Sequence, residues 1–151
     1  MTVPSSSGVK DSLYAQIGSL LGLDASVRSE VDLLDQLDKG LAVGAIQALR
    51  AGAGLTDEET SELIAPRRTL SRREALGQAL SRDEADKAVR IARITARAQR
   101  VFRGKPGYSA DWLRRPNAAL QERTPIQLLA SQSGALAVEE LLISIEYGMF
   151  G

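Results

Sequence analysis

Apolar residues recur three and four positions apart along most of this chain, and no stretch alternates apolar with polar residues for long. Spacing of this kind places apolar side chains on one face of an α-helix, whereas a half-buried strand needs alternation. The β-branched and aromatic residues that favour strands are also few. The pattern therefore predicts an all-α protein of about seven or eight helices.

Glycines, prolines and helix-capping residues set the expected bounds in the first half of the chain. Residues 1–9, with Pro4 and a serine-rich run, are expected to be a flexible tail. Three helices are expected to follow at 10–21, 30–39 and about 41–51, each ending near a glycine. We expect the second of these to bury Val31, Leu34 and Leu37.

Two capping boxes mark later helix starts. Thr56 with Glu59, and Ser81 with Glu84, have the required spacing of three residues. The first predicts a short helix from residue 57 that ends before Pro66. The second opens the longest expected helix, which runs from residue 82 to about residue 103.

The last third of the chain is expected to hold three shorter pieces. Ser109 can cap a helix over residues 110–115, and Thr124–Pro125 can cap a second piece over 126–131. A final helix is expected over 135–147, after Gly134.

The composition argues against an enzyme. The chain has no histidine and no cysteine, which removes the common general base, thiol chemistry and most transition-metal sites. Glu139 and Glu140 are adjacent, so on a helix they point about 100° apart and cannot converge on one substrate atom. The acidic run 57–59 lies where it complements a helix dipole. We expect no catalytic residue, no cofactor and no metal site.

Two absences bear on location. No apolar run approaches the roughly 20 residues that a membrane span needs. The start of the sequence lacks the basic-then-apolar pattern of a secretory signal. We therefore expect a cytoplasmic protein without a membrane partner.

Charge is unevenly distributed although the chain is neutral overall. Residues 1–65 carry 4 basic and 10 acidic side chains, residues 66–105 carry 12 and 4, and residues 106–151 carry 3 and 5. The middle segment is therefore strongly basic between two acidic flanks. A basic segment of this kind favours binding to nucleic acid.

The start of this basic segment has the outline of a helix-turn-helix, because a short helix is followed at once by a second one rich in arginine. In that motif the second helix enters the DNA major groove and its N-terminal side chains reach bases and phosphates. At 100° per residue, four polar side chains of the second helix fall within about 140°. They are Arg67, Arg68, Ser71 and Arg72.

Arginine suits such a surface because its planar fork grips guanine or phosphate through two hydrogen bonds. We expect the DNA-contacting residues to be Arg67, Arg68, Thr69, Ser71 and Arg72. Leu70 and Gly77 fall on the opposite side and are expected to pack inward. The alternative is a solvated basic surface helix, and the helix-turn-helix context favours DNA.

The longest helix carries an arginine stripe within about 80°, formed by Arg82, Arg90, Arg93, Arg97 and Arg100. Most of its remaining circumference is apolar, which predicts a central helix shared by an N-terminal and a C-terminal half. Two interpretations of the stripe stay open at this point. Its arginines contact phosphates, or they form salt bridges to the acidic flanks.

The final helix has two apolar faces. Val138, Leu141, Leu142 and Ile145 form a complete core face. A second stripe lies about 180° away, formed by Leu136, Ile143 and Tyr147. One helix of a small domain seldom buries both sides internally, so the second stripe suggests a protein partner.

The C-terminal block carries a family resemblance in "DWLRRPNAALQERTPIQLLASQSGALAVEELLISIEYGMFG". Its motifs are Trp112-Leu113, Pro116-Asn117, Thr124-Pro125, Leu128-Leu129, Gly134 and Tyr147-Gly148. In this order they resemble the Xre/MbcA/ParS-type toxin-binding domain. Upstream, "RTLSRRE" and "LSRDEADKAVRIARI" resemble the Xre-like helix-turn-helix half of the same antitoxins, so the resemblance covers roughly residues 30–151.

The resemblance implies an antitoxin of a type II toxin–antitoxin system. Its partner would be a RES-domain toxin, which consumes NAD or uses it for ADP-ribosylation. It would bind its own operator as a homodimer and form a hetero-oligomer with the toxin. The expected toxin-binding residues are Trp112, Leu113, Pro116, Asn117, Leu136, Ile143, Tyr147, Gly148, Met149, Phe150 and Gly151.

These expectations divide the chain into a helix-turn-helix region, 10–105, and a toxin-binding region, 106–151. One departure from the family pattern concerns the turn, where related sequences have Leu-Gly-hydrophobic-Ser and this chain has Leu63-Ile64-Ala65-Pro66. The turn must therefore form without glycine. The alternative function is a freestanding helix-turn-helix regulator without a toxin partner.

Overall fold

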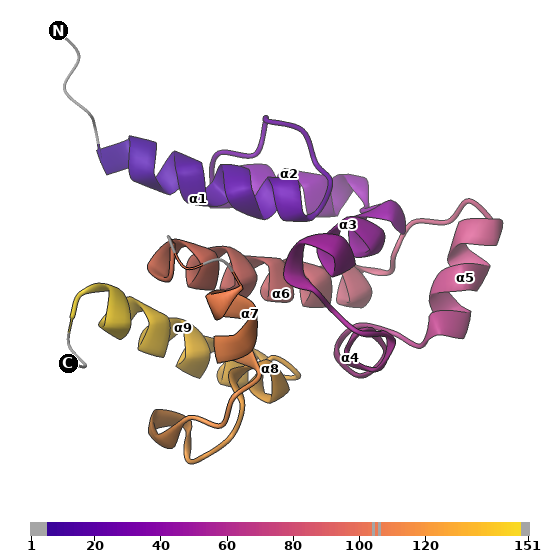
Figure 1. Cartoon of the computed structure of the whole chain (residues 1–151). Coiled ribbons are helices and arrows are strands. Elements are labelled where there is room, and N and C mark those ends of the chain that lie inside the picture. Colours follow the sequence, from indigo (N-terminus) through magenta and orange to yellow (C-terminus); the bar gives the residue numbers. More distant parts are fainter. Residues whose placement is uncertain (1–5, 104, 106, 149–151) are drawn as a thin grey trace, which may run out of the picture. The chain divides into compact units, whose positions relative to one another are not determined.

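The computed structural model describes residues 6–103, 105 and 107–148. This part of the chain contains nine α-helices, one short 3-10 helix and no strand, which confirms the all-α prediction (Figure 1). The helices are α1 Ser6–Leu20, α2 Glu30–Lys39, α3 Gly44–Ala53, α4 Asp57–Leu63, α5 Arg67–Ala75, α6 Arg82–Val101, α7 Tyr108–Leu113, η1 Ala118–Leu120, α8 Pro125–Leu128 and α9 Gln132–Glu146.

The chain divides into two compact units, residues 1–92 and 93–151. The boundary falls inside α6, so this long central helix belongs to both units. The second half of α6, from residue 93, is grouped with the second unit. Ile94, Ala96 and Ala98 on this half are all buried.

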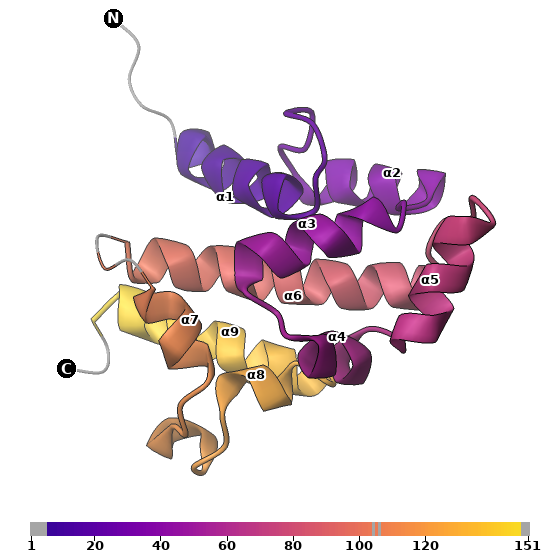
Figure 2. The ribbon, with the colours of Figure 1, turned by 45° about the vertical axis from the view of Figure 1, so that its right-hand side comes forward.

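In the first unit α1 packs closely against α3. Ile17, Leu21 and Leu49 are almost completely buried. A Cβ atom at Gly52 would lie 2.5 Å from Leu20 Cδ2, so a larger residue there would require the end of the Leu20 side chain to move. Both ribbon views show α1 and α2 on the same side of this unit (Figures 1 and 2).

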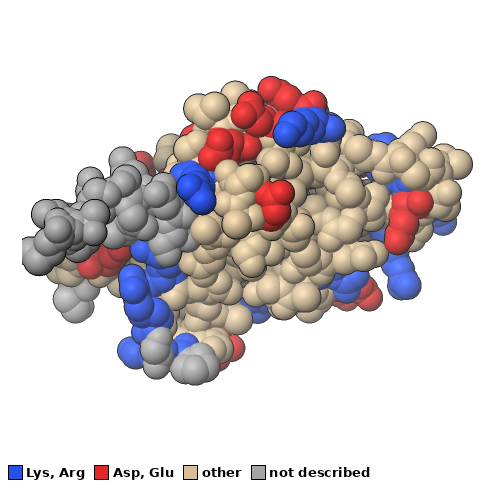
Figure 3. All heavy atoms as spheres, turned by 90° about the horizontal axis from the view of Figure 1, so that it is seen from above, with Lys and Arg blue, Asp and Glu red and all other residues tan. Residues whose placement is uncertain are grey.

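The expected buried face of α2 is wrong. Val31 and Leu34 are 64% and 47% exposed, whereas Leu33 is 1% exposed. Leu37, also expected on the buried face, is half-buried and lies about 40° from Leu33 around the helix. Packing therefore buries the face that carries Leu33 and Leu37 rather than the face that carries Val31 and Leu34. Seen from the side of α1 and α2, the outer surface also carries a group of acidic side chains (Figure 3), as expected for a helix that contains four of them.

Several helix bounds differ from the expectations. Helix α1 begins at Ser6 rather than after a tail of nine residues, and residues 1–5 lie outside the described residues. Serine and glycine are weak helix formers but do not break a helix. Helix α3 begins at Gly44 and α6 ends at Val101. Each difference is a few residues, as is usual where capping competes with propensity.

Two helices of the second unit begin at residues other than those expected, because other residues cap them. Ser109 lies inside α7, whose N-cap position is Gly107 with a φ of 77°. Helix α9 begins at Gln132, because the Ser131 side chain accepts a hydrogen bond from the Gly134 N–H at 3.0 Å. The helix therefore begins three residues before the expected start at Ala135.

The second unit packs α9 against α8 and η1, and α7 against α8. Leu129, Val138 and Leu142 form its buried centre. Gly134 permits the contact between α8 and α9, because a Cβ atom there would lie 2.8 Å from the Leu128 carbonyl carbon and closer still to its oxygen. A glycine in the first turn of α9 is therefore a packing requirement.

Candidate functional site

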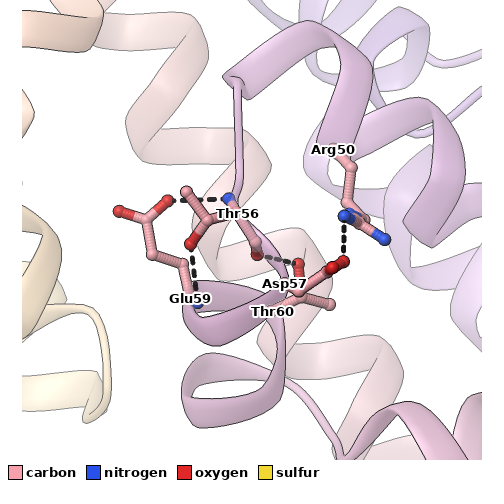
Figure 4. A network of polar contacts seen from close by, with 5 residues as sticks. All are labelled: Arg50, Thr56, Asp57, Glu59 and Thr60. Atoms are coloured by element: carbon pink, nitrogen blue, oxygen red, sulfur yellow. Dashed lines mark hydrogen bonds and ion pairs between the residues drawn. The ribbon is translucent and has the colours of Figure 1, made fainter.

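Helix α4 begins with the predicted capping box. The Thr56 N–H donates to Glu59 Oε1 at 3.0 Å, and the Glu59 N–H donates to Thr56 Oγ1 at 3.0 Å (Figure 4). Thr60 Oγ1 also donates to the Thr56 carbonyl at 2.8 Å. Arg50, near the end of α3, pairs with Asp57. These contacts anchor the first helix of the candidate helix-turn-helix.

The turn between α4 and α5 forms without glycine. The buried Thr60 carbonyl accepts hydrogen bonds from the N–H groups of Ile64 at 2.9 Å and Ala65 at 3.2 Å. Ile64 has a φ of −123°, so the turn needs no left-handed residue. Pro66 then occupies the N-cap position of α5 without a side-chain cap. The departure from the family pattern leaves the two-helix arrangement in place.

Helix α5 presents its polar face to solvent. Arg67, Arg68, Ser71 and Arg72 are exposed, Thr69 is half-buried, and Leu70 is the buried residue of the helix. The expectation for Leu70 is confirmed. Gly77 does not pack inward, because the helix has already ended at Ala75 and Gly77 is exposed with a φ of 64°.

Arg73 faces away from this polar surface and forms an ion pair with Glu84 of α6. Arg73 Nε lies 2.7 Å from Glu84 Oε1, and Arg73 Nη2 donates to Glu84 Oε2 at 3.1 Å. The two side chains are 22% and 9% exposed. Helical spacing could have found this contact, because Arg73 lies about 60° from Leu70 and about 100° from Arg72.

The same carboxylate closes the capping box of α6. The Ser81 N–H donates to Glu84 Oε1 at 2.8 Å, and the Glu84 N–H donates to Ser81 Oγ at 3.1 Å. Burial of Glu84 raises its pKa, but the hydrogen bond from the Ser81 backbone and the contact with Arg73 outweigh burial. The pKa of Glu84 is therefore below its ordinary value, and the group is ionised at neutral pH.

Two members of the arginine stripe on α6 form salt bridges. Arg82 Nη1 lies 2.9 Å from Asp38 Oδ1, and Arg82 Nε lies 3.4 Å from Asp86. In the second unit Arg97 lies 4.0 Å from Glu139 and 3.7 Å from Glu146. For Arg82 and Arg97 the salt-bridge interpretation therefore holds.

Two of the expected toxin-binding residues lie in the core of the second unit. Trp112 and Leu113 are 8% and 3% exposed. The Trp112 ring packs against Phe102 with their centroids 5.4 Å apart. Pro116 is exposed, and Asn117 caps η1 by accepting from the Ala119 N–H at 2.9 Å.

The segment after η1 has an unusual backbone. Gln121 and Glu122 both have positive φ, 57° and 64°, although neither is glycine. Together they form the centre of a tight turn in which the Arg123 N–H donates to the Leu120 carbonyl at 3.2 Å. No sequence pattern indicated this turn, because glycine or asparagine is the usual signal.

Packing buries most of the first apolar stripe of α9 and leaves much of the second exposed. Val138, Leu141 and Leu142 are buried as expected, and Ile145 is half-buried. On the other side Leu136 and Tyr147 are 53% and 75% exposed, whereas Ile143 is half-buried. Gly148 follows with a φ of 71°. The expected contact residues Met149, Phe150 and Gly151 lie outside the described residues.

The described residues show neither a cluster of three metal-binding side chains nor a helix that could span a membrane. The first unit exposes an arginine-rich face on α5, and the second unit exposes apolar side chains on α9. A protein with these features has a surface suited to DNA and a surface suited to a protein partner.

Comparison with known families matches both halves of the chain. Residues 32–93 match the antitoxin Xre-like helix-turn-helix domain, which includes α4 and α5. Residues 97–148 match the antitoxin Xre/MbcA/ParS C-terminal toxin-binding domain, which includes α9. The two matches meet within α6.

Individual relatives agree. The chain is 34% identical over 134 residues to the antitoxin Xre of Pseudomonas putida, covering 89% of this chain and 82% of that protein. It is 30% identical over 131 residues to the antitoxin Xre of Yersinia enterocolitica, covering 86% and 87%. An antitoxin Xre of Photorhabdus laumondii is 34% identical over 82 residues, 54% of this chain and 55% of that protein.

The molecule is thus a two-part antitoxin, with a helix-turn-helix domain in the N-terminal part of its sequence and a toxin-binding domain in the C-terminal part. The chain belongs to the Xre/MbcA/ParS antitoxin family. Proteins of this family are not enzymes, and the toxin-binding domain implies a cognate toxin.

Proposed function

We propose that this antitoxin neutralises a RES-domain, NAD-consuming or ADP-ribosylating toxin and represses its own operon. The proposal has two parts, one for each unit. The observation that carries the first part is the outward array of Arg67, Arg68 and Arg72 on α5. The observation that carries the second is the exposure of Leu136 and Tyr147 on α9.

In the first part, the exposed face of α5 contacts operator DNA through Arg67, Arg68, Thr69, Ser71 and Arg72. The protein binds as a homodimer to a palindromic site, because paired recognition helices read paired half-sites. Val31 and Leu34 of α2, both exposed, belong to the apolar faces of the first helices through which a second copy would dock.

Replacing Arg68 and Arg72 by alanine tests this part. Each lost phosphate contact lowers the slope of log K against log salt by about 1, so the double variant should bind weakly with a flatter slope. The control removes two exposed cations elsewhere in the unit, Arg28 and Lys39. If both variants bind the promoter like the wild type at every salt concentration, α5 is only a solvated basic surface.

In the second part, the C-terminal segment enters the NAD pocket of the toxin. Burial of Tyr147, Met149 and Phe150 would return about 1.5–3 kcal/mol each. Ordering about five residues costs about 1–2 kcal/mol per residue. These sums nearly cancel, so the segment alone would bind weakly. Leu136 and Ile143 must therefore supply much of the affinity.

The remaining expected contact residues have different roles in this proposal. Trp112 and Leu113 are buried, so they would support the binding surface by packing. Pro116 is exposed and would contact the toxin directly, beside Asn117. The complex would be a hetero-oligomer of toxin and antitoxin.

Deleting residues 148–151 tests the blocking mechanism. We expect the truncated protein to fold and bind DNA as before, but to leave much of the toxin's NAD turnover active even where a complex still forms. The measurement is NAD consumption by purified toxin with each form of the antitoxin. Full inhibition by the truncated form would place the block in the body of the 109–147 region instead.

The alternative of a freestanding regulator is tested by the neighbouring gene. An antitoxin predicts that the neighbour is toxic alone and co-purifies with this protein when both are expressed. A harmless neighbour that does not co-purify would favour the regulator. The match to a toxin-binding domain favours the antitoxin.

A further inference from the structure

The recognition helix α5 has little apolar attachment to the rest of its unit. Leu70 is its one buried residue, and its first turn lacks a side-chain cap. A single buried side chain determines where a helix sits but restrains its rotation poorly. The direction in which the arginines of α5 point therefore depends on another contact.

Arg73 supplies that contact. It follows Leu70 by three residues and lies about 60° from it around the helix. Its partner Glu84 is itself fixed, because the Ser81 N–H and the Arg73 guanidinium hold the same carboxylate. The hydrogen bond from Gln47 to Glu74, at 3.5 Å, is much longer. The largely buried ion pair, with its shorter distances, therefore restrains the rotation of α5 more than this hydrogen bond does.

We propose that Arg73 and Glu84 are positioning residues for DNA recognition: their ion pair sets the rotation of α5, and Arg73 does not contact DNA. The proposal rests on DNA binding by α5. It separates Arg73 from Arg67, Arg68 and Arg72, which the sequence alone places in one basic run. It also gives the capping carboxylate of α6 a second role in the neighbouring helix.

The variant Glu84→Gln tests the pair without removing the cap, because glutamine at this position also completes a capping box. The control is Asp83→Asn, on the same turn of α6. Asp83 is 76% exposed and pairs with Lys87 at 3.0 Å. Both variants change the net charge equally, so they alter the general attraction to DNA by the same amount.

The measurement is fluorescence anisotropy with a duplex from the region upstream of the gene and a scrambled duplex of equal length. We expect Glu84→Gln to bind the upstream duplex about tenfold more weakly or worse, with little change on the scrambled duplex. Asp83→Asn should bind both like the wild type. Thermal unfolding of each variant shows whether the fold is retained.

A second set of variants separates positioning from direct contact. Arg73→Gln should weaken binding as much as Glu84→Gln, the double variant should be no worse than either, and Arg73→Lys should recover part of the loss. If Arg73→Gln weakens binding while Glu84→Gln does not, Arg73 contacts DNA itself and the proposal is wrong. Equal binding by Glu84→Gln and Asp83→Asn would also overturn it.

Failure of the underlying function has a different signature. If the wild type binds the upstream duplex no better than the scrambled one, α5 does not recognise an operator. If the wild type discriminates and the Glu84 and Arg73 variants discriminate equally well, only the positioning role fails.

Discussion

Replacing Gly134 by alanine tests whether the second unit depends on the close approach of α8 and α9. A Cβ atom at this position would lie 2.8 Å from the Leu128 carbonyl carbon, closer still to its oxygen, and 3.0 Å from Ser131 Oγ. The obstacle is backbone, so no side chain can rotate away. Helix propensity acts in the opposite direction, because alanine is favoured over glycine by about 1 kcal/mol within a helix.

The steric clash lowers the stability of the Gly134→Ala variant and the helix propensity raises it, so the size of the clash decides the net change. Overpacking against a fixed neighbour costs about 1–3 kcal/mol or more. Displacing the start of α9 would also weaken the hydrogen bond from the Gly134 N–H to Ser131 Oγ, a cap that contributes about 1 kcal/mol. After the propensity gain we expect a net loss of about 1–3 kcal/mol, or a fall in Tm of about 2–12 °C.

Gly44→Ala is the matched control. Gly44 also lies in the first turn of its helix, but a Cβ atom there would meet no atom within 4 Å. This control should leave stability unchanged or raise it slightly. The assay is thermal unfolding followed by circular dichroism, together with toxin neutralisation in cells. A Gly134→Ala protein as stable as the Gly44→Ala protein would refute the packing argument.

Three further predictions concern the first unit. Leu33→Ala should lower the free energy of unfolding, measured by urea titration, by about 2–5 kcal/mol, whereas Val31→Ala should change it by no more than about 0.5 kcal/mol. Equal losses would show that Val31 is buried as much as Leu33. Ile64→Gly, which restores the family's glycine, should destabilise the protein, because Ile64 is 4% exposed and needs no positive φ; a gain in Tm would contradict this. Glu84 has a pKa below its ordinary value of 4.5, so its contribution is complete above about pH 4.5 and is lost as the pH falls through the folded-state pKa. The stability difference between wild type and Glu84→Gln should therefore be constant between about pH 8 and pH 5 and shrink in more acidic solution; a difference that does not change with pH would show that the carboxylate charge is irrelevant.

Local sequence signals were sufficient wherever a helix is determined by its own residues. The capping boxes at Thr56 and Ser81 predicted the starts of α4 and α6, because each box is completed by side chains three residues apart. Helical spacing alone identified Leu70 as the buried side of α5. The motifs of the C-terminal block were sufficient to identify the family.

The choice between two chemically similar faces was decided only by tertiary structure. On α2 both stripes are apolar, and Leu33 rather than Val31 is buried because of what packs against the helix. On α5 helical spacing already separates Arg73 from Arg67, Arg68 and Arg72, but only the fold supplies its partner, Glu84. Contacts of this kind join residues from different helices, and helical periodicity carries no information about which faces meet. The sequence therefore determined the helices and the family, and the packing determined which residues remain available to bind.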